Sequence, residues 1–238
     1  NMEGFFMCYQ PIANSETGHI VGMEALLRWQ HKDFGVVPPG MFIPWLEMEP
    51  CFFELGNWII ERSLTDAMEI RRTRPDFVVN VNISATQLEN HGFRQSVVDI
   101  LNRTKYPPEY LCMELTERCK NMDIAFLKNE LEFFRKLGVK IAIDDFGTGN
   151  ATLNLLTELP IDELKVDMSF VRGIQESKPN QVLVQAVVSC AHELGYKSCI
   201  EGVEDKALFE YLHRYGSTYY QGYHFSRPVT LEEFKKLL

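Results

Sequence analysis

The sequence has little of what indicates a secreted, membrane-spanning or nucleic-acid-binding protein. Its 238 residues include six cysteines, without a CxxC pair or the spacing of a disulfide framework, so a reducing cytoplasm is the expected location. Charges interrupt each apolar run well before the ~18 residues of a membrane span, and no cleavable signal with a basic start is recognisable. The net charge of −9 argues against binding to duplex nucleic acid, whose affinity comes largely from Lys and Arg.

Motifs for zinc and for nucleotide cofactors are also missing. The segment Gly147–Gly149 is too short for a dinucleotide fingerprint, and no GxxxxGK[ST] sequence is present. Metal-ligand spacing is absent among the histidines, which we interpret as structural or solvated: His19, His31, His91, His192, His213 and His224.

What the sequence does contain is an alternation of short apolar runs with amphipathic segments. The runs are typical of buried parallel strands and lie at 77–83, 111–115, 139–143 and 164–166. Helices are expected at 55–72, at 121–137 and at 181–194. The predicted buried faces of the last two comprise Ile124, Leu127, Leu131 and Phe134, and Leu183, Val187, Cys190 and Leu194.

The beginning of the chain departs from this alternation. Two apolar segments, 6–12 and 19–29, flank Asn14–Gly18, whose composition favours a tight turn, so a β-hairpin is expected. With the strand–helix units that follow, the pattern predicts an α/β fold of one domain over residues 1–238, a closed (β/α) barrel. An open, doubly wound sheet is the alternative.

Polar residues close, or nearly close, most of the predicted strands. In a barrel the carboxyl ends of the strands meet at one mouth, so these residues should lie together. They are Glu24, Asn82, Glu114, Asp144, Asp145, Lys165, Glu201 and Gln221. Singly, each has a simpler explanation: Asp145 and Glu114 as helix caps, Lys165 as half of a surface pair with Asp167, Asn82 as a turn residue and Gln221 as a backbone partner.

The carboxylates of this set predict a metal site. Gathering them at a partly buried mouth costs several kcal/mol per uncompensated ion, so cations are expected to balance them. Oxygen ligands with one amide and no His or Cys suit Mg²⁺ or Mn²⁺. The adjacent Asp144 and Asp145 favour a pair of ions about 3.5–4 Å apart, an arrangement that serves phosphoryl transfer.

The sequence Glu24–Trp29, EALLRW, resembles the signature of EAL-domain cyclic-di-GMP phosphodiesterases. Further segments resemble the remaining motifs of that family in order, over essentially the whole chain: Tyr9–Ile12, Val81–Ser84, Glu114–Glu117, Asp144–Gly149, Lys165–Asp167, Glu201–Glu204 and Gln221–Pro228.

The resemblance implies a (β/α)8 TIM-like barrel with an antiparallel first strand, and hydrolysis of cyclic-di-GMP to linear pGpG. It places one metal ion on Glu24, Asn82, Glu114 and Asp144 and a second on Asp145 and Glu201. It makes Glu24, Lys165 and Glu201 catalytic, with Lys165 holding or activating the attacking water. Substrate contacts fall to Gln10 and Arg28, and support of the loops and ligands falls to Glu117, Glu204 and Gln221.

The chain departs from the family pattern in the loop after the Asp pair. Asn150 and Ala151 stand where an aromatic residue and a serine are usual, so we expect a less ordered loop and a turnover that suffers more than nucleotide affinity. A departure at Trp45–Pro50 is expected to affect local packing only. The family's leading helix is missing, so we expect a domain excised from a longer protein with regulatory or diguanylate-cyclase modules, and a homodimer remains open.

The sequence leaves three functions to weigh. An active phosphodiesterase is favoured because all the metal ligands are present. A silent cyclic-di-GMP receptor would be expected to lack a metal carboxylate while keeping Gln10 and Arg28, and a protein-interaction module could lack both sets. Which of Lys165 and Glu201 acts as the general base is open, because both lie near a metal that changes their titration.

Overall fold

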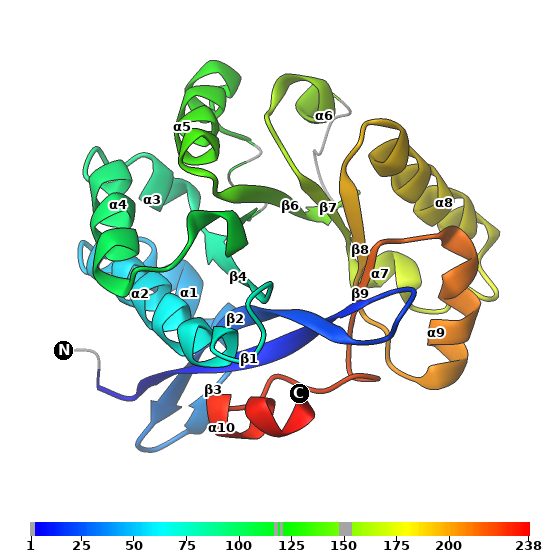
Figure 1. Cartoon of the computed structure of the whole chain (residues 1–238), viewed down its shortest axis with the longest axis horizontal. Coiled ribbons are helices and arrows are strands. Elements are labelled where there is room, and N and C mark those ends of the chain that lie inside the picture. Colours follow the sequence, from blue (N-terminus) through cyan, green and yellow to red (C-terminus); the bar gives the residue numbers. More distant parts are fainter. Residues whose placement is uncertain (1–2, 117–118, 120, 148–153) are drawn as a thin grey trace.

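A computed structural model describes residues 3–116, 119, 121–147 and 154–238. Over these residues nine strands form one sheet, with helices around its outside (Figure 1). The strands are β1 (Phe5–Asn14), β2 (Ile20–His31), β3 (Gly35–Val37), β4 (Val78–Ile83), β5 (Leu111–Leu115), β6 (Lys140–Phe146), β7 (Glu163–Val166), β8 (Lys197–Ile200) and β9 (Tyr219–Gln221).

The helices of the described residues follow most of the strands along the chain. They are α1 (Pro39–Leu46), α2 (Phe52–Arg71), α3 (Ala85–Leu88), α4 (Phe93–Thr104), α5 (Ile124–Leu137), α6 (Asn154–Glu158), α7 (Met168–Val171), α8 (Lys178–Glu193), α9 (Lys206–Leu212) and α10 (Leu231–Phe234), with 3₁₀ turns at Pro108–Tyr110, His213–Tyr215 and Lys235–Leu237. None of the helices in these ranges combines the length and the apolar character that crossing a membrane requires.

The sheet closes on itself as a barrel. Its order is β1-β9-β8-β7-β6-β5-β4-β2-β3, and β1 also pairs with β2, so eight strands form the barrel and β3 extends β2 outside it. The strand β1 is antiparallel to both β2 and β9, whereas β2 and β4 to β9 run parallel to one another. The predicted TIM-like barrel with an antiparallel first strand is confirmed, and the open-sheet alternative is wrong.

The opening hairpin forms as predicted. The Asn14 side-chain oxygen accepts hydrogen bonds from the backbone N–H groups of Glu16 and Thr17 at 3.1 and 3.0 Å. Gly18 completes the turn in the left-handed region, with a φ of 68°. The turn therefore sets the register in which Gln10 of β1 lies opposite Glu24 of β2.

The buried faces of two helices were predicted with different success. Leu127, Leu131 and Phe134 of α5 are buried as expected, although Ile124 in its first turn is 38% exposed. The face predicted for α8 is half right: Val187 and Cys190 are partly buried and pack against the core, whereas Leu183 and Leu194 are exposed.

The buried face of α8 is rotated by one residue from the prediction. Leu183 and Leu194 are 46% and 43% exposed, whereas Val184, Val188 and Ala191 are buried. The helix has two adjacent apolar stripes, and packing against β7 and β8 buries the one with the smaller side chains, which permit closer approach.

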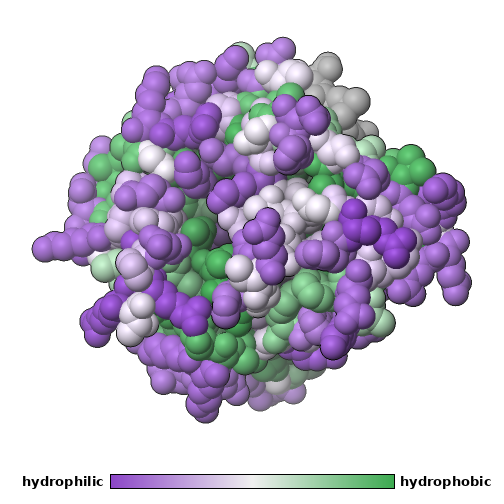
Figure 2. Space-filling model, turned by 45° about the vertical axis from the view of Figure 1, so that its right-hand side comes forward, coloured by the Kyte–Doolittle hydropathy of each residue, from purple (hydrophilic) through white to green (hydrophobic). Residues whose placement is uncertain are grey.

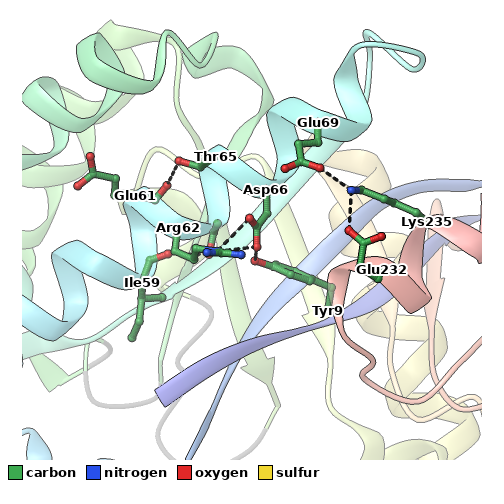
Figure 3. A network of polar contacts seen from close by, with 10 residues as sticks. Tyr9, Ile59, Glu61, Arg62, Thr65, Asp66, Glu69, Glu232 and Lys235 are labelled. Atoms are coloured by element: carbon green, nitrogen blue, oxygen red, sulfur yellow. Dashed lines mark hydrogen bonds and ion pairs between the residues drawn. The ribbon is translucent and has the colours of Figure 1, made fainter. Parts of the chain in front are cut away.

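Polar contacts attach α2 to the barrel and the C-terminal segment to α2 (Figure 3). The Tyr9 hydroxyl of β1 donates to Asp66 of α2 at 2.5 Å, and Arg62 pairs with the same carboxylate at 2.9 Å. Lys235 pairs with Glu69 of α2. Hydrophilic side chains cover most of the face in Figure 2, with hydrophobic residues showing in the hollows between them.

All six cysteines are free thiols, and Cys8, Cys112, Cys119 and Cys199 are buried. Cys51 is exposed.

Candidate active site

The mouth of the barrel is organised around Lys165, a buried lysine near the carboxyl end of β7. Its Nζ lies 2.9 Å from Glu114 Oε2, 2.7 Å from Glu201 Oε1, 3.3 Å from Asp144 Oδ1 and 3.6 Å from Glu24 Oε2. The alternation of side chains along parallel strands brings these groups together, since each strand turns every second residue inward. Neighbouring strands thus converge on one ammonium group, and a surface pair of Lys165 with Asp167 is excluded.

Amide side chains hold the carboxylates in place. Glu24 accepts hydrogen bonds from Asn82 Nδ2 at 2.8 Å and from Gln221 Nε2 at 2.5 Å. The Gln221 amide also donates to Gln10 Oε1 at 3.1 Å, and Asn80 Nδ2 donates to Glu114 Oε1 at 2.7 Å. Glu114 is therefore a fully buried member of the cluster and not a helix cap.

One ammonium group does not neutralise four carboxylates, and the pKa values reflect this excess. Burial raises the pKa of Glu201 to about 8, against the opposing effect of Lys165. Burial likewise raises the pKa of Glu114 well above its usual range, against the same opposing effect. For Glu24, burial is outweighed by Lys165 and by the hydrogen bonds from Gln221 and Asn82, so its pKa is lowered. The cluster without further cations thus favours protons on some carboxylates.

A cation site is available at one side of this cluster. Asp144, Asp145 and Glu201 each offer a carboxylate oxygen, and these oxygens lie within 4.8 Å of one another. Asp144 and Asp145 lie at an irregularity in β6, where the register against β7 shifts between Ile143 and Phe146. Asp145 has a φ of 48°, a strained conformation for a residue other than glycine, which turns it away from the regular alternation.

The donor set fits a hard divalent cation. Asp144 Oδ1 is buried, and although it lies 3.3 Å from the Lys165 ammonium group it has no hydrogen bond among the described residues, so it can accept a further cation. The three groups supply oxygen ligands only, as Mg²⁺ and Mn²⁺ prefer.

Two cavities open at the mouth, and Leu26 lines both. The smaller one, about 220 Å³, is also lined by Gln10, Glu24, Asp144 and Glu201. The larger one, about 640 Å³, contains Asn82 and Asp145 on its wall and extends over α1 and α2. Together they give the carboxylate cluster access to a ligand of several hundred cubic ångströms.

The other predicted site residues lie in the carboxylate cluster, on a cavity wall, farther along β2 or outside the described residues. Gln10 and Gln221 lie within it, and Glu204 is an exposed residue on the wall of the smaller cavity. Arg28 lies four residues beyond Glu24 on the same face of β2, where its Nη1 donates to the carbonyl of Leu27 at 2.8 Å. Glu117 and the loop residues Asn150 and Ala151 lie outside the described residues.

Glu24 does not lie at the end of its strand as predicted, and Asn80 was not predicted to belong to the site. Glu24 is in the interior of β2, because this strand continues past the mouth to pair with β1 and β3. Asn80 lies two residues before Asn82 on β4, so the period of two along a strand would have indicated that both face inward.

The chain matches the family model described as "EAL domain" over residues 2–228. It is 33% identical to the cyclic di-GMP phosphodiesterase PA2567 of Pseudomonas aeruginosa over 99% of this chain and 40% of that protein. The solved structure of the EAL enzyme Bd1971 in its cAMP- and cyclic-di-GMP-bound form is similar with a TM-score of 0.93 and 35% identity, over 99% of this chain and 65% of that one.

A second solved structure, the PaMucR phosphodiesterase in complex with c-di-GMP, is similar with a TM-score of 0.92 and 33% identity, over 97% of this chain and 94% of that one. The chain spans less than half the length of the curated relatives it matches, for example 29% of the signaling protein YkoW of Bacillus subtilis. With the barrel, the carboxylate cluster and a family match over nearly its whole length, this chain belongs to the EAL domain family.

Proposed function

We propose that this domain hydrolyses one phosphodiester of cyclic-di-GMP to linear pGpG with the help of two Mg²⁺ or Mn²⁺ ions. The observation that carries the proposal is the contact of Lys165 with four carboxylates beside the oxygen cluster of Asp144, Asp145 and Glu201. Family relatives named as cyclic-di-GMP phosphodiesterases, and solved relatives in complex with that nucleotide, support the choice of substrate.

We propose the metal-binding roles that the resemblance to the EAL family implies. Glu24, Asn82, Glu114 and Asp144 would hold one ion, and Asp145 with Glu201 would hold the other. Bound there, the ions would supply a water of lowered pKa and stabilise the charge that develops on the phosphate. Gln221, Asn80 and Asn82 fix the orientation of the ligand carboxylates, which reduces the rearrangement needed on binding.

The protein's own groups would then align water and substrate. Lys165 is buried and contacts the carboxylates of the mouth, and in this proposal it would hold the attacking water beside Glu201. Since Lys165 Nζ and Glu201 Oε1 are 2.7 Å apart, a proton released at either group can pass to the other. Gln10 and Arg28 would contact the substrate, Arg28 at a phosphate oxygen.

The test is incubation of the protein with cyclic-di-GMP and Mn²⁺, followed by chromatography for pGpG. Formation of pGpG that Glu201→Gln abolishes supports the proposal. Retention of the nucleotide on the protein without turnover would instead identify a receptor, and failure of both binding and turnover would favour an interaction module. A homodimer, and regulatory or cyclase domains in a longer parent protein, are predictions that other experiments must address.

A further inference from the structure

A separate cavity opens at the opposite end of the barrel. It has a volume of about 740 Å³, and Val78, Lys140, Glu163, Lys197 and Tyr219, which begin or nearly begin their strands, line it. It shares no lining residue, within the described part of the chain, with the two cavities at the mouth. The proposed catalytic groups thus lie at one end of the strands and this basal cavity at the other.

The basal cavity reaches into the barrel because small side chains line its depth. Gly22 of β2 and Cys112 of β5 are on its wall, together with Asn80. The Asn80 amide donates a hydrogen bond to Glu114, which lies nearer the mouth of the barrel. Bulky branched residues usually fill this layer of a TIM barrel. Here the space is open to a molecule of the size that ligand cavities commonly hold.

One carboxylate oxygen on the wall of the basal cavity lacks a hydrogen-bond partner among the described residues. Glu163, at the start of β7, is 8% exposed, and its Oε1 has no hydrogen-bond partner among the described residues. A buried acceptor without a partner is costly, so this oxygen is a specific point of attachment for a donor. Burial raises the pKa of this carboxyl to about 7, against the opposing effects of Lys165 and Lys197.

The basic groups of the basal cavity already have partners. Arg135 pairs with Asp162 at 3.2 Å, and Lys140 lies 3.8 Å from the same carboxylate. Lys197 Nζ donates to the Tyr219 hydroxyl at 2.6 Å. Among the described residues, Glu163 Oε1 therefore receives no hydrogen bond from these basic groups, although Lys165 and Lys197 act on the carboxylate through space.

The remaining wall determines what kind of donor fits. Two more carboxylates, Asp76 and Glu109, line the basal cavity, so acidic groups exceed basic ones there and a cation is favoured over an anion. Ile12, Ile161 and Leu194 add apolar surface for the body of a ligand. The cavity thus combines a buried acceptor, an acidic balance and apolar walls.

We propose that the basal cavity is a binding site for a small organic cation, whose ammonium or amidinium group donates to Glu163 Oε1 and whose apolar body packs against Ile161 and Leu194. This site is independent of the phosphodiesterase chemistry proposed for the mouth. Its ligand requires at least one N–H donor and a compact carbon skeleton.

The test uses benzamidine as the probe and the methyl NMR signals of the full chain as the readout. Ile12, Val78 and Ile161 report on the basal cavity, and Leu26 reports on the mouth. We expect saturable shifts at the basal methyl groups, with affinity at least ~10-fold weaker for benzamide, which has the same shape without the charge. Glu163→Gln should abolish these shifts, and Glu201→Gln should leave them intact.

The comparison of benzamidine with benzamide needs no variant, so the proposal stays testable if Glu163→Gln does not fold. Equal affinity for the two probes would overturn it, because the charge would then have no role. Shifts confined to Leu26, or no shifts at all, would also overturn it, since the probe would then bind elsewhere or not bind.

Discussion

Glu201 Oε1, directly after β8, lies 2.7 Å from Nζ of Lys165, which is the second-last residue of the adjacent parallel strand β7. This contact joins a carboxylate of the candidate metal cluster to the buried cation at the centre of the mouth. Any ion that binds Asp144, Asp145 and Glu201 must therefore coexist with, or displace, the ammonium group. Lys165 and a bound metal ion would thus both supply positive charge to the same oxygens, and the contribution of each can be tested.

Lys165→Met should abolish most of the turnover. The substitution keeps much of the side-chain volume but removes the donor that would hold the water, and such a loss typically lowers kcat ~10²–10³-fold. Steady-state kinetics with cyclic-di-GMP and Mn²⁺ give the measurement. The matched control is Lys140→Met, which changes a half-exposed lysine at the other end of the barrel and should leave kcat unchanged. A Lys165→Met variant with normal turnover would remove this residue from the mechanism.

Removal of divalent metal should stop hydrolysis, and added Mn²⁺ should restore it. The reason is that Asp144, Asp145 and Glu201 collect more negative charge than Lys165 balances. Asp144→Asn should weaken Mn²⁺ binding at least ~10-fold in a calorimetric titration, because one ligand oxygen is replaced by an amide. Glu193→Gln, at an 85% exposed side chain on α8, serves as the control. Full turnover in excess EDTA would contradict the metal-dependent reading.

The barrel and most of its mouth could be predicted because short apolar runs, each followed by a polar residue, indicate the strands. Asn82, Glu114, Lys165 and Gln221 all lie in the last two positions of their strands, so spacing alone brought them together. Glu24 was placed at a strand end by the same reasoning, but β2 continues past the mouth, and strand length depends on the partners β1 and β3.

Other features depend on three-dimensional packing that no local pattern contains. The prediction for α8 was wrong at Leu183 and Leu194 because Leu183 and Val184 belong to adjacent apolar stripes, and only contact with the sheet selects the one that is fully buried. The convergence of four carboxylates on Lys165 depends on the closure of the barrel, and the unpartnered oxygen of Glu163 depends on which neighbours surround it. Sequence periodicity carries no information on either point.

Tyr9→Phe should lower the free energy of unfolding by about 1–3 kcal/mol. The Tyr9 hydroxyl donates to Asp66, whose carboxylate is 2% exposed and would be left with the Arg62 contact (Figure 3). Urea denaturation of the variant and the parent measures the difference. Tyr223→Phe is the control, because Tyr223 is 50% exposed and its loss of a hydroxyl should change stability little. Equal effects of the two substitutions would show that the buried contact contributes nothing specific.

The last prediction concerns Glu163 and the dependence of stability on pH. Burial raises the pKa of this carboxyl to about 7 from the 4.5 usual for glutamate, while Lys165 and Lys197 oppose the effect. Its other charged neighbours are Asp162 and Asp144, which raise the pKa further. Because the folded-state pKa lies above the unfolded one, ionisation disfavours the folded state. The folded protein should thus lose stability as the pH rises from about 4.5 to about 7, and no more from this group at higher pH.

Glu163→Gln removes this ionisation and nearly keeps the shape of the side chain. The variant should gain stability relative to the parent across that pH range, by an amount on the order of 2–3 kcal/mol, with a constant difference above about pH 8. Urea unfolding of both proteins between about pH 5 and 9, without added amines, gives the difference at each pH. Glu193→Gln, at a solvent-exposed carboxylate, should follow the parent throughout. If the curves of Glu163→Gln and the parent ran parallel, Glu163 would titrate alike in the folded and unfolded chains, and its burial would not govern its charge.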